Sequence, residues 1–387
     1  MEIGSIYEIN PAWLDKQDEF LEEESGPLKL QYVERYGKKN TVYTGSGREA
    51  IDLAIQSLLE EQPGLSKRVL LPSYMCDSVF IPFLRNGWEL FFYSVNRAMQ
   101  ISKEQLQFCI QETRPSLLFI HGYYGMDSFK EWENFLIEQQ QAGLLVMEDL
   151  TQSYYRKRRT QFTPDYLIGS LRKWYFIPDG GFVTTDHYLN QNLLSDASVF
   201  PKERMEMLTD KWNYLQAVSK ENWEELQKQK QAYLQKNREL ELFLDEKETI
   251  SVLSDSARKL LLQVEEEKDC TKRKANALFL YREFMKLTGE EFSLIPGTEG
   301  SAALYFPVYV RHREEYQSYL QKQDIYAPVL WPVGEENRPF LKEEERYIYA
   351  HLLALPMDQR YGEAEMQRLV DVTKQYLERT GNACDRN

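Results

Sequence analysis

The sequence predicts an α/β fold in which a large, doubly wound domain with a mostly parallel sheet precedes a smaller α+β domain. Over about residues 39–210, apolar runs of strand length alternate with amphipathic stretches of helical length. After about residue 249 the pattern becomes helix, strand, helix, strand and helix. The expected organisation is an N-terminal arm (1–38), the large domain (39–210), a connecting helix (211–248) and the small domain (249–387).

The elements of the large domain follow from apolar spacing. Apolar residues three and four positions apart favour helices, whereas short runs rich in Val, Ile, Leu, Phe and Tyr favour buried strands. The expected strands cover residues 68–74, 89–95, 116–123, 144–150, 165–170 and 180–185. The expected helices cover residues 49–61, 78–86, 103–112 and 130–141.

Helices and strands are also expected toward the two ends of the chain. In the small domain the same spacing predicts helices at 270–287, 314–323 and 363–378, with strands at 303–310 and 352–358. The N-terminal arm combines a short strand-like segment at 3–9 with an acidic patch at 19–25. Neither feature of the arm carries a recognisable chemistry.

Composition excludes several classes of function. A net charge of −14 and a pI near 5.0 argue against nucleic acid as a partner, because phosphate binding needs an excess of Lys and Arg. No apolar run approaches the ~18 residues of a membrane span, and the N-terminus lacks the order of a signal peptide, so we expect a cytoplasmic protein. Four scattered histidines and four separated cysteines predict neither a metal site nor a disulfide framework.

The segment 165–186 places two apolar strands around a chemically unusual loop, LRKWYFIPD. Lys173 lies in that loop, three residues after Ser170. Two interpretations are open. Lys173 is either a Schiff-base lysine whose neighbouring serine reaches a phosphate, or a solvated surface lysine.

A second candidate is the segment TVYTGSGREAI, where Ser46 and Glu49 have capping-box spacing at the start of a helix. The segment is either a capped helix and nothing more, or an anion site. In an anion site Gly47 admits a phosphate to the amides of Arg48 and Glu49, and Arg48 adds charge. Gly45, Gly47 and Ala50 also match a dinucleotide fingerprint, but the preceding residues are polar and the next strand ends without an acidic residue.

A third candidate follows the apolar strand at 144–150, where Glu148 and Asp149 lie at the carboxyl edge of the sheet. Asp149 is either a turn residue or the partner of a pyridinium nitrogen, and Gln152 would reach the same ring. The basic run at 154–162 is expected to be the solvated tip of a hairpin.

Taken in order, these motifs resemble the DegT/StrS-type sugar aminotransferases. The resemblance rests on SGREAI, LLPSYMCDSVFIPFLRNG, FIHGYYG, VMEDLTQ, SLRK with PDGGFVTT, and LLALPMDQRYGEAEMQRLV, and spans about residues 42–370. It implies fold type I of the pyridoxal-phosphate enzymes, with a three-layer αβα large domain. It also implies that Lys173 binds the cofactor, that Asp149 pairs with the pyridine nitrogen and that Gln152 contacts the ring oxygen. Gly47, Arg48 and Glu49 would form the phosphate cup.

Three positions depart from the family pattern. The usual phosphate-binding serine, five residues before the lysine, is replaced by Ile168, and Ser170 stands at the three-residue spacing of other branches. Arg48 replaces a small hydroxyl residue in the cup. Cys76 occupies the position of the aromatic residue that stacks on the ring, which leaves Tyr74 and Tyr123 as candidate substitutes.

The resemblance implies a homodimeric aminotransferase with its active site at the subunit interface. It would transfer an amino group by ping-pong kinetics, with glutamate as the donor and a nucleotide-linked keto-sugar of polysaccharide or secondary-metabolite biosynthesis as the acceptor. Two alternatives remain open. The first keeps the cofactor but changes the reaction to that of a dehydratase, lyase or desulfurase, since ring electronics do not select the bond that breaks. The second is a binding protein that keeps the fold but has lost catalysis.

Overall fold

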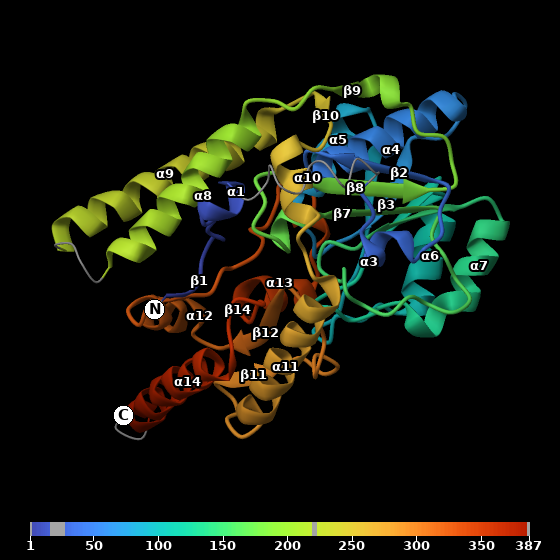
Figure 1. Ribbon diagram of the computed structural model, residues 1–387. Coiled ribbons are helices and arrows are strands. Elements are labelled where there is room, and N and C mark those ends of the chain that lie inside the picture. The colour runs from blue at the N-terminus through green and yellow to red at the C-terminus, as the bar shows by residue number, and fades with distance from the viewer. Residues whose placement is uncertain (1, 16–27, 219–222, 385–387) are drawn as a thin grey trace. The chain divides into compact units, whose positions relative to one another are not determined.

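The computed structural model describes residues 2–15, 28–218 and 223–384 (Figure 1). The acidic patch at 19–25 lies outside these residues. The chain divides into two compact units. Unit 1 comprises the chain up to Ser5, Leu65–Asp165 and the chain from Glu265 onward, and unit 2 comprises Ile6–Gly64 and Tyr166–Val264.

A parallel sheet forms the first part of unit 1. Its strands run in the order β6 (Leu145–Asp149), β5 (Leu117–His121), β3 (Arg68–Pro72) and β4 (Glu89–Tyr93). The residues of β5 are all buried, as expected of a central parallel strand covered on both faces. The helices of this part are α5 (Phe80–Arg85), which packs on β4, α6 (Lys103–Thr113), which packs on β3 and β4, and α7 (Glu133–Gln141), which packs on β6.

An antiparallel sheet forms the second part of unit 1, in the order β11 (Phe292–Leu294), β12 (Tyr305–Val310) and β14 (Leu352–Pro356). Its helices are α11 (Glu266–Phe284), α12 (Arg313–Gln321), α13 (Glu343–His351) and α14 (Glu363–Cys384). β1 (Ile3–Gly4) pairs in parallel with β13 (Ile325–Tyr326). Apolar side chains from both parts of unit 1 join one buried cluster.

In unit 2, β8 (Gly181–Thr185) pairs antiparallel with β2 (Asn40–Thr44) on one side and with β7 (Tyr166–Ser170) on the other. α4 (Gly47–Glu61) packs on β2, β7 and β8. Gly181 is required for this packing, because a Cβ atom there would lie 2.2 Å from the carbonyl carbon and oxygen of Ser46. The start of α4 therefore lies directly against the start of β8.

The remaining helices of unit 2 are α1 (Ala12–Asp15), α3 (Gln31–Glu34), α8 (Phe200–Ala217), α9 (Trp223–Glu246) and α10 (Asp255–Leu261). α8 and α9 lie side by side along their lengths in Figure 1. The short strands β9 (Leu194–Ser195) and β10 (Ile250–Ser251) pair in parallel. The stretch expected as a connecting helix thus contains the end of α8 and all of α9.

The expected fold class is confirmed: strands and helices alternate, and the larger sheet of unit 1 is parallel throughout. The expected strands and helices of the large domain all form, with differences of a few residues at their ends. The elements that were not expected include β2, β11 and α13 and the short elements α1, α3, β9, β10, α10 and β13. β2 is only partly buried, and polar residues at its start hide the strand pattern.

Candidate functional site

Lys173 ends the single 3₁₀ turn Leu171–Lys173 that follows β7, and its side chain is exposed. The turn is closed by the amides of Trp174 and Tyr175, which donate to the carbonyl of Leu171 at 2.9 and 3.1 Å. Both aromatic side chains are buried. The lysine therefore projects from a short turn whose following residues are anchored in the core.

Ser170 and Gly47 lie together, as the phosphate-site interpretation requires. A Cβ atom on Gly47 would lie 3.1 Å from Cβ of Ser170, so the first turn of α4 contacts the last residue of β7. Oγ of Ser46 accepts the amide of Glu49 at 3.3 Å, which gives α4 its cap. The amides of Gly47 and Arg48 belong to a helical first turn, the position at which helices bind anions.

The side chains of Arg48 and Glu49 are engaged by the end of α9 and the segment after it. Arg48 pairs with Asp245 at 2.5 Å and donates to the carbonyl of Leu244. Glu49 is buried, pairs with Lys247 and accepts the hydroxyl of Ser251 at 3.2 Å. Their contribution to an anion site is thus confined to their backbone.

A further group of charges lies beside Lys173. Arg172 forms a two-pronged pair with Glu241 of α9, with nitrogen to oxygen distances of 2.6 and 2.9 Å. Arg204 of α8 reaches the same carboxylate at 3.0 Å. Burial opposes the ionisation of Glu241, but the charges of Arg172, Arg204 and Lys173 outweigh it and hold the pKa of Glu241 well below its usual range.

Asp149 ends β6 directly opposite His121, the last residue of β5, and both side chains are buried. Oδ2 of Asp149 lies 3.3 Å from Nδ1 of His121, a close approach without the alignment of a directed hydrogen bond. Oδ1 accepts the amide of Thr151 at 2.7 Å. Burial favours the neutral acid, but His121 and Thr151 outweigh it and hold the pKa of Asp149 below its usual range.

Gln152 is buried in the turn after β6, and its side chain has a defined orientation. Its Oε1 accepts the amide of Tyr124 at 3.2 Å, and its carbonyl accepts the amide of Gly125 at 2.9 Å. Because Oε1 is used as an acceptor, Nε2 is the group that Gln152 offers as a donor.

Cys76 is partly exposed, with its Sγ 3.0 Å from Oγ of Ser78. The two tyrosines that could replace it as a stacking residue are buried. Tyr123 donates to the carbonyl of Tyr74 at 2.6 Å, and its ring contacts that of His121 in an edge-on arrangement at 4.8 Å. Tyr123 is thereby the tyrosine that contacts the partner of Asp149.

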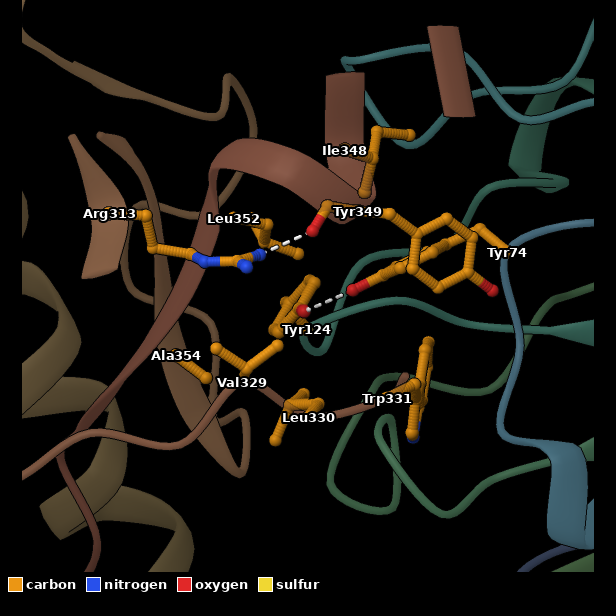
Figure 2. Close-up of a pocket in the computed structure, with 10 residues that line it drawn as sticks. All are labelled: Tyr74, Tyr124, Arg313, Val329, Leu330, Trp331, Ile348, Tyr349, Leu352 and Ala354. Carbon is orange, nitrogen blue, oxygen red and sulfur yellow. Dashed lines mark hydrogen bonds between the residues drawn. The ribbon is translucent and has the colours of Figure 1, made fainter. Parts of the chain in front are cut away.

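A small hollow of about 10 Å³ lies within unit 1, and Figure 2 shows the residues that line it. Tyr74 and Tyr124 meet there through hydroxyls 3.2 Å apart, and the ring of Trp331 lies 4.7 Å from that of Tyr74. Arg313 enters from the opposite side and donates to the carbonyl of Tyr349. The hollow is lined by aromatic and aliphatic side chains and by one cationic group, and it has room for little more than a water molecule.

The prediction that the basic run at 154–162 is a solvated hairpin tip is wrong for two of its arginines. Arg156 and Arg159 are buried, and both pair with Glu148 at 2.7 Å. Arg159 also pairs with Asp127 at 2.6 Å. The run lacks the alternation of a strand and instead neutralises the buried carboxylate of Glu148.

The part of the chain that the structure describes shows neither a metal site nor a membrane-spanning helix. No three His, Cys, Asp or Glu side chains within residues 2–15, 28–218 and 223–384 are grouped so as to hold a metal ion. Across the same residues, no helix has the length and apolar character needed to cross a bilayer.

Sequence reasoning missed His121 and Glu241. The signal for His121 was its place at the carboxyl end of a predicted strand, next to the strand that ends in Asp149. Glu241 had no such signal, because it lies in a polar helix about seventy residues from Arg172.

The chain has the fold of solved structures described as aminotransferases, among them sugar aminotransferases and one protein solved in PMP and PLP forms. The putative sugar aminotransferase Spr1654 from Streptococcus pneumoniae, in its PMP form, matches with a TM-score of 0.67 at 14% identity, covering 100% of both chains. PseC from Helicobacter pylori, an aminotransferase of pseudoaminic acid biosynthesis, matches with a TM-score of 0.65 at 16% identity, covering 98% of this chain and 100% of its own.

A DegT DnrJ EryC1 StrS aminotransferase from Brucella abortus matches with a TM-score of 0.62 at 16% identity, covering 96% of this chain and 91% of its own. Neither a protein-family model nor a curated protein sequence matches the chain. The similarity therefore establishes the fold.

Proposed function

We propose that the protein is a pyridoxal-phosphate-dependent aminotransferase. The observation that carries the proposal is the contact between Gly47, at the start of α4, and Ser170, three residues before the exposed Lys173. One short region of unit 2 thus combines a helix N-terminus, a hydroxyl and a primary amine. These are the groups that a phosphate and an aldehyde on one cofactor would require.

The residues of each unit fit the cofactor chemically. In unit 2, the amides of Gly47 and Arg48 and the hydroxyl of Ser170 would hold the phosphate, and Lys173 would bind the cofactor covalently. In unit 1, the low pKa of Asp149 keeps its carboxylate charged, as the partner of a protonated ring nitrogen must be. Nε2 of Gln152 would donate to the ring oxygen. When bound, pyridoxal phosphate supplies an electron sink for the substrate's Cα.

The residues would then divide the work of transamination. The amine of Lys173, once displaced by the substrate amine, moves a proton at the substrate Cα as a general base and acid. The carboxylate of Asp149 would supply the negative charge at the ring nitrogen throughout, and His121 would favour that ionised form. The buried aromatic residues around His121 exclude water from this end of the site and strengthen its electrostatics.

The donor, acceptor and assembly are further parts of the proposal. Some of the structurally similar proteins are described as sugar aminotransferases, which supports a keto-sugar acceptor. We further propose that this acceptor is nucleotide-linked and that glutamate is the donor. A cytoplasmic homodimer with its site at the subunit interface completes the hypothesis. Two half-reactions at one site predict ping-pong kinetics.

The test is to purify the protein with pyridoxal phosphate, record its visible absorbance, reduce it with borohydride and map the modified peptide. A pyridoxyl group on Lys173 is the expected result, and Lys173→Ala should remove it. Lys157→Ala is the matched control, because Lys157 is also exposed and lies in a loop of unit 1. Modification of another lysine, or none, would contradict the proposal.

A further inference from the structure

We propose that Glu241 of α9 positions the turn that carries Lys173, acting through Arg172 and Arg204. The inference rests on the proposed function in taking Lys173 as the reactive lysine. Glu241 is a positioning residue in this scheme, since its own contacts are with the two arginines and with no reacting atom.

The first support is geometric. Arg172 is the residue directly before Lys173, in the same 3₁₀ turn. Its two terminal nitrogens lie 2.6 and 2.9 Å from the two oxygens of Glu241. A two-pronged pair restricts rotation as well as distance, so it fixes the direction of the Arg172 side chain relative to α9. That restriction is transmitted to the neighbouring lysine through one peptide bond.

The second support is that Glu241 has a buried second partner. Arg204 of α8 is 6% exposed, and its Nη1 lies 3.0 Å from Glu241 and 3.3 Å from Oδ1 of Asn237. Arg172 and Arg204 both contact Oε1 of Glu241, so the two guanidinium groups are close together. In agreement, burial and the charge of Arg172 lower the pKa of Arg204 to about 10, although Glu241 favours its charged form. Without Glu241 they would repel across the turn.

The third support is that the rest of the turn is already held on its other side. The amides of Leu171 and Arg172 donate to the carbonyl of Gly180 at 2.9 and 3.3 Å, and Tyr7 donates to the carbonyl of Trp174 at 3.1 Å. The pair with Glu241 therefore joins this turn to α9. Lys173 itself lies close enough to Glu241 for its charge to favour the ionised carboxylate.

The experiment compares Glu241→Gln and Arg172→Lys with a matched control, Glu203→Gln. Glu203 of α8 pairs with Lys236 of α9 at 2.7 Å, so it also bridges the two helices but does not touch the turn. Arg172→Lys keeps the charge and loses the two-pronged geometry. It also serves as a second variant if Glu241→Gln fails to fold.

The first readout is hydrogen exchange of the peptide spanning residues 171–176, measured without added cofactor. In both test variants this peptide should exchange roughly tenfold faster than in wild type. A tenfold change corresponds to the loss of about 1.4 kcal/mol of stabilisation of the turn. The control should match wild type. Unchanged exchange in the test variants, or the same increase in Glu203→Gln, would overturn the proposal.

The second readout is the dissociation constant for pyridoxal phosphate, followed by absorbance. Both test variants should bind it roughly tenfold more weakly, since a mispositioned Lys173 loses effective concentration at the cofactor. Faster exchange with unchanged affinity would mean a purely structural tether and would also overturn the proposal. If wild type binds no pyridoxal phosphate, the proposed function fails, whereas the exchange measurement still tests whether Glu241 orders the turn.

Discussion

The surroundings of Lys173 in unit 2 and of Asp149 in unit 1 are stabilised in different ways. In unit 2, Lys173 is exposed, and its surroundings are ion pairs that α9 supplies to Arg172 and Arg48. In unit 1, Asp149 is buried beside His121, which the rings of Tyr123 and Trp331 contact edge-on. One region depends on charges held at the surface, and the other on a charge held in the interior.

The roles proposed for Lys173 and Asp149 account for this difference. A lysine that binds a cofactor and then moves protons has to be reachable, so it is positioned by its neighbours. A carboxylate that keeps a ring nitrogen protonated has to stay charged, so it needs a partner that outweighs burial. The regions should therefore respond differently to mutation, to pH and to salt.

The largest effect on stability is expected for Gly181→Ala, which damages the unit 2 region by steric overlap. The new Cβ would lie 2.2 Å from the carbonyl of Ser46, and backbone cannot move aside as a flexible side chain would. We expect a loss of about 4 kcal/mol or more in the free energy of unfolding, measured by urea denaturation. Gly64→Ala, which has no atom within 4 Å of its Cβ, is the control and should change stability by less than about 0.5 kcal/mol.

Asp149→Asn is the corresponding change in unit 1. It removes the charge and keeps the shape, so the proposed aminotransferase should retain cofactor while its turnover falls by roughly 10²- to 10⁴-fold. The measurements are the steady-state rate and the absorbance of bound cofactor. Turnover within a factor of two of wild type would remove Asp149 from the mechanism.

Asp179→Asn should show how a buried carboxyl in unit 2 behaves without an ion pair. Burial raises the pKa of Asp179 to about 6, although Ser254 donates to it, while Glu49 opposes its charge and Lys247 favours it. The folded state thus binds this proton more tightly than the unfolded state does. Asp179 therefore costs wild type stability progressively as pH rises from about 4 to about 6.

The asparagine variant should be more stable than wild type by up to about 3 kcal/mol at pH 8, and the difference should vanish near pH 4. Thermal unfolding at several pH values measures it. Asp186→Asn is the control with the opposite sign. Burial slightly opposes the charge of Asp186, but Lys38 and Lys39 outweigh it and lower its pKa, so its contribution is present at pH 8 and is lost on acidification. A gain in stability independent of pH would contradict the prediction for Asp179.

The smallest effect is expected for Arg48→Ala. It removes the pair with Asp245 and the bond to the carbonyl of Leu244, but Asp245 is half-exposed, which weakens the pair. The expected loss is about 1 kcal/mol, decreasing with added salt, as measured by urea denaturation at two ionic strengths. Lys202→Ala, an exposed change on α8, should have no salt-dependent effect. A loss that does not depend on salt would show that Arg48 acts through packing.

Sequence reasoning recovered the strands and helices of the large domain because each is set by local spacing of apolar residues. It also found the SxxK turn and the end of β6, since both lie where a strand pattern stops. It could not assign partners to Arg48, Glu49 or Arg172. Those partners lie about seventy to two hundred residues away, and a polar helix such as α9 gives no local sign of which face is engaged.

The same long-range contacts bear on the order in which the protein folds during synthesis. α4 begins at Gly47, yet the side chains of its first turn find their partners only at Asp245, Lys247 and Ser251, and β2 next to it pairs with a strand that begins at Gly181. A ribosome must therefore complete about 250 residues before this corner can form. Until then the charged side chains in the first turn of α4 lack these partners, so this part of unit 2 can complete its folding only late in synthesis.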